Sequence, residues 1–489
     1  MKKLTYKELL VLSGFAPCID ARFLDSAIAY AYRSESAVLI IDSLFTVEPL
    51  IRKDLNRKGV YFFEWSYFTT SHSSVRHLAD KAQIEESYLP GLEMLKRFPG
   101  PPNNNPQISY LILKESVLSL ERLLSHLPHP SLVLSYDIPH SGFDYCLLYC
   151  SSLISTPSYY FRSTGLISYA KTLHRANDWK MPGARRPLKL HNSSLPISIK
   201  AIKDVISVFQ RRDVTSNSLP YSEDKINAIK RLLVSRKRDI YRDLEANNQA
   251  IAYLAGLKRK YTTLTAQRNE HIIGINSIVY FLQREPEAST LPEALPFLNQ
   301  VSVIKLLRSR LPSHIAIYVK EHPETFVDLE TIVWPHICDT SVWRQPKYYD
   351  NILDAGACGF IPLKMSSKKI LECKPLAVCT LAGSVYTEAL RSGIPCIAHP
   401  AASYSRWPGV VNLFSEQLEK EITRAHEIIA ECAKKQSFAY GEAESLCEYL
   451  YPISLRRDDN AEETIDNVSE QIMDSARQLF SLASNLKCM

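Results

Sequence analysis

Short apolar runs alternate with longer stretches of helical periodicity along most of the chain. The first half carries "AVLIID" (37–42), "VYFFEW" (60–65) and "SLVL" (131–134). The second half carries "SIVYFL" (277–282), "IAIYV" (315–319), "GFIPL" (359–363), "LAVCT" (376–380) and "PCIAH" (395–399). Strands that alternate with helices predict parallel sheets, because a parallel pair needs a crossover connection. The pattern therefore predicts an α/β protein.

The alternation is interrupted once, and this interruption suggests the domain boundaries. We expect an N-terminal Rossmann-like acceptor domain over 1–220, bridging helices over 221–270, a C-terminal Rossmann-like domain over 271–410 and a C-terminal helical segment over 411–489. Ligands of open parallel sheets bind outside the carboxyl ends of the strands. Two such domains joined by helices predict a cleft with polar motifs at strand ends.

Composition narrows the class of protein. The chain has 489 residues, of which 46% are hydrophobic and 22% charged, so it has the composition of a folded protein with two or three domains. The net charge of +6 is small for this length. It does not indicate a nucleic-acid partner, but it suits an anionic ligand or a membrane surface.

Cysteine usage and hydropathy bear on the compartment. Eleven cysteines occur without a CxxC pair, which is typical of reduced, buried thiols in a cytoplasmic protein and predicts no metal site. Glu8 interrupts a starting apolar stretch that is already too short for a signal peptide. No uninterrupted apolar run reaches ~18 residues, so we expect any contact with the inner membrane to be peripheral.

Several common catalytic motifs are missing. The chain has no GxGxxG after a strand, no GxxxxGK[ST] loop, no GxSxG elbow and no DxD pair. The usual dinucleotide, P-loop and hydrolase chemistries therefore lack their residues. Without a DxD pair, we expect no metal ion and no cofactor.

The run "YVKEHP" ends a strand with a histidine. Pro323 stops the ladder because it has no N–H to donate, so His322 is expected to project toward a ligand rather than the core. Its imidazole could donate to a phosphate, with Lys320 as a second cation and Glu321 favouring the imidazolium. The alternative is a strand-end histidine bonded to a nearby carbonyl.

The run "LAVCTLAGSVYTEAL" predicts a strand, a turn of small residues and a helix. Gly383 lets a ligand approach the backbone, and the helix that begins near Ser384 offers unpaired N–H groups to a phosphate. Glu388 lies one turn later, where it could accept from ribose hydroxyls. Alternatively, Ser384 is a simple N-cap and Glu388 a solvated acid.

Two further polar loops follow strands. In "FLQREPEAST", Gln283 and Glu285 could contact the edge of a nucleobase, or the loop could merely close the strand.

In the first half, "SYDIPHSGFDY" places Asp137, His140 and Asp144 after an apolar strand, as a base or nucleophile with an orienting partner. We favour Asp137, which directly follows the strand, with His140 orienting it. An Asx-turn with a helix cap is the alternative, and Arg162 in the next polar turn could meet an acidic acceptor.

The second half has a family resemblance. The run "YFLQREPEAST…IAIYVKEHP…RQPKYYDNI…LAVCTLAGSVYTEALRSGIPCIAHP", within 275–410, resembles bacterial capsule and surface-polysaccharide biosynthesis glycosyltransferases of GT-B fold, and is most similar to the capsule-synthesis proteins that include β-Kdo transferases. The first half matches in general layout and in its "DIPH" loop. The chain departs from the family at Glu285-Pro286, where relatives tend to have Gln-Pro, and it lacks an "EDGF"-like motif.

The resemblance implies a cytoplasmic, metal-independent sugar transferase. Its C-terminal lobe would bind a nucleotide-sugar donor, CMP-linked Kdo or a sialic-acid-like sugar, and its N-terminal lobe a glycan or glycolipid acceptor such as lipopolysaccharide. By correspondence, His322 and Pro323 would contact the donor phosphate or cytidine, Ser384 would follow the small turn, and Glu388 would bind ribose. Two alternatives are a non-catalytic surface-polysaccharide assembly protein, which needs no paired carboxylates, and a nucleotide-sugar epimerase, which needs no acceptor.

Overall fold

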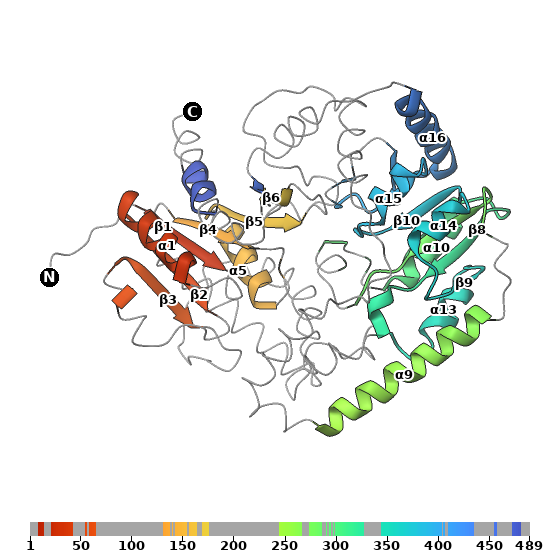
Figure 1. Ribbon diagram of the computed structural model, residues 1–489, viewed down its shortest axis with the longest axis horizontal. Coiled ribbons are helices and arrows are strands. Elements are labelled where there is room, and N and C mark those ends of the chain that lie inside the picture. Colours follow the sequence, from red (N-terminus) through yellow and green to blue (C-terminus); the bar gives the residue numbers. More distant parts are fainter. Residues whose placement is uncertain are drawn as a thin grey trace. The chain divides into compact units, whose positions relative to one another are not determined.

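The computed structural model divides the chain into two units (Figure 1). Unit 1 comprises Met1–Leu95, Asn105–Ser193 and Ser445–Met489, and unit 2 comprises Lys96–Asn104 and Ser194–Glu444. The structure describes residues 8–13, 21–42, 54–55, 58–64, 131–136, 139, 142–153, 156–163, 169–175, 244–266, 273–285, 290, 293–294, 297, 299–326, 344–402, 404–405, 409–434, 454–456 and 472–480.

Unit 1 is an α/β sheet that the two ends of the chain build together. Its elements are β1 (Glu8–Ser13), α1 (Ala21–Arg33), β2 (Ser36–Asp42), β3 (Val60–Glu64), β4 (Ser131–Ser135), α5 (Gly142–Leu153), β5 (Ser158–Ser163), β6 (Tyr169–Arg175) and β13 (Ser454–Arg456). The strand order is β13-β6-β5-β4-β1-β2-β3. Strands β1 to β5 are parallel, whereas β6 and β13 extend the sheet with antiparallel pairing.

The core of unit 1 explains why its central strands are almost wholly apolar. Leu10 and Leu12 of β1 pack on α1 and on the C-terminal helix of residues 472–480. The alternate residues Leu9 and Val11 are buried as well, and α5 packs against β4 and β5. A parallel sheet covered on both faces needs apolar residues at every position rather than at every second one.

Unit 2 holds a second α/β sheet. Its elements are α9 (Leu244–Ala266), β7 (Ser277–Phe281), α10 (Val301–Arg310), β8 (Ala316–Lys320), the 3-10 helix η5 (Pro323–Phe326), α13 (Tyr348–Asp354), β9 (Gly359–Ile361), α14 (Ser367–Glu372), β10 (Ala377–Thr380), α15 (Val385–Arg391), β11 (Cys396–Ala398), β12 (Val410–Asn412) and α16 (Leu418–Lys434). All pairings between its strands are parallel.

The strand order of unit 2 is that of a Rossmann sheet. Counted from β7, the order β9-β8-β7-β10-β11-β12 is 3-2-1-4-5-6. The order of the parallel strands in unit 1, β3-β2-β1-β4-β5, has the same pattern. The prediction of two Rossmann-like α/β domains is therefore confirmed. In each sheet the strands that follow the first one are added on one side of it, and later strands are added on its other side. The point where this direction reverses, here called the switch, lies between β7 and β10 in unit 2 and between β1 and β4 in unit 1.

Both faces of the unit 2 sheet are covered. Ile278 and Tyr280 of β7 lie in the large cluster of the unit, whereas Val279 between them lies in a smaller cluster with Tyr318 and Ile370. Helix α9 runs beside β9 (Figure 1). The inner strands β7, β8, β10 and β11 are thus almost wholly buried, whereas Asn412 on the edge strand β12 is exposed.

The observed division differs from the expected one in two places. Contacts separate the units at Ser193 and Ser194 rather than near residue 220, and α9 belongs to unit 2. The expected helical segment over 411–489 divides as well. Helix α16 stays in unit 2, whereas β13 and the helix of residues 472–480 complete unit 1. A chain end can join a distant sheet because strand pairing is not local, and no periodicity within the tail marks this.

Two glycines in unit 2 allow a test of its packing. Gly356 has φ +105°, and a Cβ there would lie 2.8 Å from Arg308 Cγ. Gly393 has φ +78° but no heavy atom within 4 Å of such a Cβ. We expect Gly393→Ala to lower the free energy of unfolding by about 1 kcal/mol through backbone strain alone, and Gly356→Ala by roughly 2–4 kcal/mol. Urea denaturation measures both; equal losses would show that Arg308 moves aside freely.

Candidate functional site

The switch between β7 and β10 brings two distant loops together. The Gln283 side chain, just past β7, donates from Nε2 to Thr380 Oγ1 at the end of β10. The Gly383 N–H donates to the same hydroxyl at 3.1 Å. Ligands of doubly wound sheets bind outside the strands at this kind of switch. Gln283 and Gly383, which the sequence predicts to contact a nucleotide, are therefore joined through Thr380 at the edge where a ligand is expected.

The turn after β10 is tightly packed beneath this edge. A Cβ on Gly383 would lie 2.6 Å from Thr380 Oγ1 and 3.0 Å from Gln283 Nε2. Tyr404 donates its hydroxyl to the Gly383 carbonyl at 2.8 Å, and its ring stacks on Tyr386. Glycine is thus required by close approach between protein segments, which is a different reason from the ligand approach expected.

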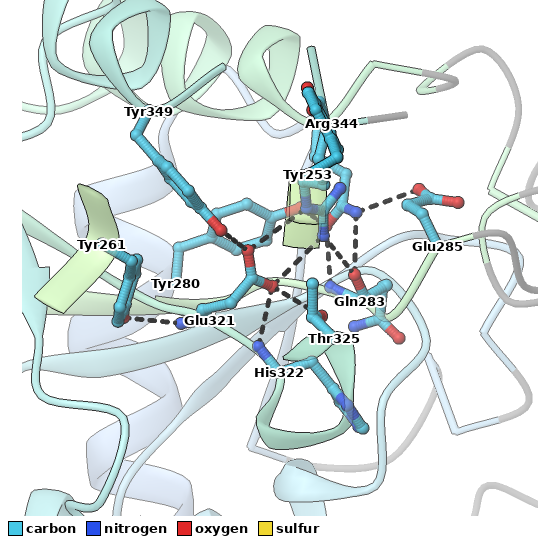
Figure 2. A network of polar contacts seen from close by, with 11 residues as sticks. Tyr253, Tyr261, Tyr280, Gln283, Glu285, Glu321, His322, Thr325, Arg344 and Tyr349 are labelled. Carbon is cyan, nitrogen blue, oxygen red and sulfur yellow. Dashed lines mark hydrogen bonds and ion pairs between the residues drawn. The ribbon is translucent and has the colours of Figure 1, made fainter. Parts of the chain in front are cut away.

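A fully buried carboxylate lies at the end of β8. Glu321 is 0% exposed, yet its two oxygens accept five hydrogen bonds (Figure 2). The donors are Arg344 Nε and Nη2 at 3.2 Å each, Tyr349 OH at 2.7 Å, Thr325 Oγ1 at 3.1 Å and the His322 N–H at 2.9 Å. A buried charge is tolerated only when it is paired and saturated in this way.

The partner of this carboxylate, Arg344, is buried as deeply. Its guanidinium donates to Glu321 from Nε and Nη2, and Nη2 also donates to the Gln283 carbonyl at 2.8 Å. It stacks 4.4 Å above the centre of the Tyr348 ring. The hydroxyl of Tyr253 on α9 donates to the Arg344 carbonyl. The planar fork of arginine suits this combination of a carboxylate and a backbone oxygen.

Both members of the pair are charged. Burial would raise the pKa of the Glu321 carboxyl, but the Arg344 charge and hydrogen bonds from Arg344, Tyr349 and the His322 N–H hold it below its ordinary value. Burial works against the charged form of Arg344, but the neighbouring Glu321 raises the pKa of the guanidinium. The interior of unit 2 therefore contains an ion pair at neutral pH.

Gln283 and Glu285 are both buried in the same polar network. Gln300 pairs with the Gln283 backbone like a neighbouring strand, accepting from its N–H at 2.7 Å and donating to its carbonyl at 3.1 Å. Glu285 accepts from Gln300 Nε2 at 3.0 Å and from Thr290 Oγ1 at 2.8 Å. These bonds organise the loop after β7; contact of either residue with a nucleobase stays a prediction.

His322 differs from its neighbours because it is only half-buried. Figure 2 shows its ring pointing away from the Glu321 carboxylate, which contacts only its backbone N–H in the network drawn. That Glu321 favours the imidazolium form of His322 stays a prediction. Pro323 begins η5 and is exposed, as expected of a residue that ends the strand. Successive residues of an extended chain point to opposite sides, so one faces the core and the next faces out.

Lys320 points away from the switch. Its ammonium donates to the carbonyls of Pro362 at 3.1 Å and Leu363 at 2.7 Å, just past β9. Burial lowers the pKa of Lys320 to about 8, although the Glu321 charge works in the opposite direction. Its role in nucleotide binding stays a prediction, and its observed partners are backbone oxygens of the β9 loop.

The helix after the small turn begins as predicted. Ser384 is the N-cap residue of α15 and is exposed, but its side chain makes no capping hydrogen bond. Glu388 is exposed one turn later, where its carboxylate accepts from the Ser367 hydroxyl on α14. A solvated, first-turn acid agrees with one of the two interpretations of Glu388, and contact with ribose stays a prediction.

Unit 1 has a polar pair at its own switch. Ser13 ends β1, and its hydroxyl donates to Asp144 Oδ1 at 3.0 Å in the first turn of α5. Asp137 and His140 lie outside the described residues. Among the catalytic candidates, the structure thus places Asp144 at the β1/β4 switch, where the pattern of the sheet predicts a ligand.

Sequence reasoning missed the residues on which the site is built. Arg344, Tyr349, Thr325 and Gln300 were not identified as site residues, although all are buried and polar. The available signal was "WRQPKYY", in which one arginine lies among three aromatic residues. Such an arginine suggests a buried partner, because lysine and arginine are rarely buried unless paired.

Among the described residues, no group of three or more His, Cys, Asp or Glu is placed to hold a metal ion. In the same part of the chain, no helix has the length and apolar character needed to cross a bilayer.

Comparisons with known proteins give distant structural likenesses. No family model and no curated protein matches the chain. A protein from Listeria monocytogenes named as a UDP-N-acetylglucosamine 2-epimerase is 9% identical, with 91% of this chain and 95% of that chain covered and a TM-score of 0.25.

Two further solved structures have similarly low sequence identities and TM-scores. Phytolacca americana UGT2, complexed with UDP-2-fluoro-glucose and pterostilbene, is 11% identical over 97% of this chain and 99% of that chain, with a TM-score of 0.22. A family 9 glycosyl transferase from Veillonella parvula is 9% identical over 87% of this chain and 98% of that chain, with a TM-score of 0.19. The α/β assignment itself stands on the strand orders.

The lowered pKa of Lys320 predicts a pH-dependent stability. Below about pH 8 the lysine is protonated in both the folded and the unfolded state, so burial of its charge destabilises the fold in full. Above that pH the folded state releases the proton first, and stability rises until the unfolded state also titrates near 10.5. Relative to Lys320→Met, the wild-type free energy of unfolding should rise by roughly 2 kcal/mol from pH 8 to pH 10. Urea denaturation of both chains measures this, and a constant difference would contradict it.

Proposed function

We propose that the chain is a glycosyltransferase of GT-B type that takes a sugar from a nucleotide donor bound at the carboxyl edge of the unit 2 sheet. The observation that carries the proposal is the meeting of three strand ends at one edge. Gln283 follows β7, His322 follows β8, and the turn with Gly383 follows β10. Two Rossmann-like sheets in one chain are the components of a GT-B transferase.

The chemistry of this edge suits an anionic ligand. His322 supplies an imidazole that can donate to a phosphate, and the N–H groups at the start of α15 lie beside the small turn. The buried ion pair below supports the edge without presenting its own charge to a ligand, because both groups are 1% exposed or less. Departing phosphate would then be stabilised by side chains and backbone donors rather than by a metal ion.

The donor is proposed to be CMP-linked, with an acidic sugar such as Kdo or a sialic-acid-like sugar. The support is the likeness of residues 275–410 to capsule-synthesis transferases and the His322-Pro323 pair within it. The acceptor is proposed to be a bacterial surface glycan or glycolipid, handled in the cytoplasm with peripheral contact to the inner membrane. An excess of positive charge, +6, favours both an anionic donor and an anionic surface.

Unit 1 is proposed to supply the base. Transfer requires removal of a proton from an acceptor hydroxyl or a carboxylate nucleophile. Asp144 occupies the β1/β4 switch, and the Ser13 hydroxyl fixes one of its oxygens at 3.0 Å. We propose that the Asp144 carboxylate takes the proton of the acceptor hydroxyl, with Asp137 and His140 as the other candidates.

The donor site can be tested by binding. A thermal-shift panel of CMP, CDP, UDP and GDP should show stabilisation by CMP above the others, because a ligand that binds only the folded state raises its stability. His322→Ala should weaken CMP binding about tenfold, because it removes one charge-assisted hydrogen bond. His314→Ala is the matched control, since His314 is exposed at the opposite end of β8. Equal affinities in the His322 and His314 variants would remove His322 from the site.

The base can be tested by turnover. Asp144→Asn keeps an oxygen for the Ser13 hydroxyl but loses the charge, so we expect a fall of about 10²–10⁴-fold in rate with CMP affinity preserved. Release of CMP from a CMP-linked acidic sugar in the presence of EDTA and an acceptor glycan measures this. Asp54→Asn is the control, because Asp54 is an exposed carboxylate of unit 1, and its turnover should equal that of wild type.

Two outcomes would change the proposal. Loss of turnover in Asp137→Asn alone would assign the base to Asp137. Conversion of the sugar in the absence of an acceptor would indicate an epimerase.

A further inference from the structure

Arg344 bridges the ends of two neighbouring strands at the point where their pairing stops. The register of β7 and β8 ends at Phe281 and Lys320, and one more backbone bond joins Leu282 N–H to the Lys320 carbonyl at 2.9 Å. Beyond it, the guanidinium joins the Gln283 carbonyl on one side to the Glu321 carboxylate on the other. A single side chain therefore continues the connection between the strands after the backbone ladder has ended.

The groups bound to this bridge lead directly to the proposed donor site. On the β8 side, Glu321 holds the His322 N–H at 2.9 Å. On the β7 side, the Gln283 side chain bonds Thr380 of β10, whose hydroxyl also accepts from the Gly383 N–H. Figure 2 shows the part of this path that runs from the backbone of His322 through the ion pair to Gln283, and the bonds of Gln283 and Gly383 to Thr380 continue it to the turn after β10.

Arg344 is itself held in place by two contacts and by its burial. Its guanidinium stacks on the Tyr348 ring, its carbonyl accepts from Tyr253 of α9, and it is 1% exposed. Lys260, also on α9, holds the following loop by donating to the Pro346 carbonyl at 3.2 Å. A side chain held by such contacts can set the distance between two other groups, because packing and hydrogen bonds fix its rotamer.

We infer that Arg344 is a positioning residue that sets the spacing between His322 and the β10 turn, and through it the affinity for the nucleotide. This inference rests on the proposed function. A buried ion pair adds little net stability compared with apolar residues of the same volume, so stability is a weak reason for its presence. Its geometry supplies a stronger reason, since a planar fork holds the two carboxylate oxygens and the carbonyl in fixed directions from separate nitrogens.

The test compares two identical substitutions in unit 2. Arg344→Lys keeps the charge but replaces the rigid fork, which binds Glu321 and the Gln283 carbonyl through Nε and Nη2, with a single nitrogen on a flexible stem. Arg308→Lys is the control, because Arg308 binds the carbonyls of Ile315, Leu311 and Pro312 around the amino end of β8. Both variants should unfold at lower urea concentration than wild type. Calorimetric titration with CMP and UDP should show a dissociation constant raised about tenfold to a hundredfold in Arg344→Lys and unchanged in Arg308→Lys.

The outcomes separate the inference from the function beneath it. Wild-type protein that binds neither nucleotide overturns the proposed donor site and the inference with it. If wild type binds, equal affinity in Arg344→Lys, or equal weakening in Arg308→Lys, shows a structural role only and overturns the inference. Should Arg344→Lys fail to fold, Tyr253→Phe removes the hydroxyl that donates to the Arg344 carbonyl. We expect it to weaken nucleotide binding several-fold, and wild-type affinity in that variant would falsify the inference.

Discussion

The ion pair between Glu321 and Arg344 is the constraint on which the rest of unit 2 depends. Two opposite charges lie in an apolar interior, and each is acceptable there because the other is present and further hydrogen bonds join both to their surroundings. Removing either partner would leave an uncompensated buried charge, a loss on the order of 3–5 kcal/mol. The pair therefore dictates which residues must surround it, namely Tyr349, Thr325 and the Gln283 backbone.

The position of the pair follows from the topology of the sheet. Parallel strands end at the same edge, and the reversal of order between β7 and β10 marks the place on that edge where ligands of such sheets bind. Backbone groups beyond a strand have lost their ladder partners and must find others. In unit 2 these partners are side chains, with Gln300 pairing to the Gln283 backbone and Glu321 accepting from the His322 N–H. The half-buried His322 ring is then presented by a rigid support.

The same logic applies to unit 1 with different residues. Ser13 and Asp144 meet at the β1/β4 switch although 131 positions separate them in the chain. The sheet that holds them is extended by β13 from the opposite end of the chain, and the helix of residues 472–480 covers one of its faces. Both units thus create their polar edges by joining segments that are distant in sequence.

Local pattern was sufficient to predict the strands, their parallel arrangement and the polar residues at their ends, because a strand covered on both faces must be apolar throughout and a ligand edge must be polar. It placed Gln283, His322, Gly383 and Ser384 at strand ends, where the structure has them. Only the tertiary structure decided that Gln283 and Glu321 face inward, that Arg344 pairs with them, and that β13 and the helix of residues 472–480 belong to unit 1. A residue's neighbours along the chain cannot specify a partner that folding brings from far away, and burial depends on such partners.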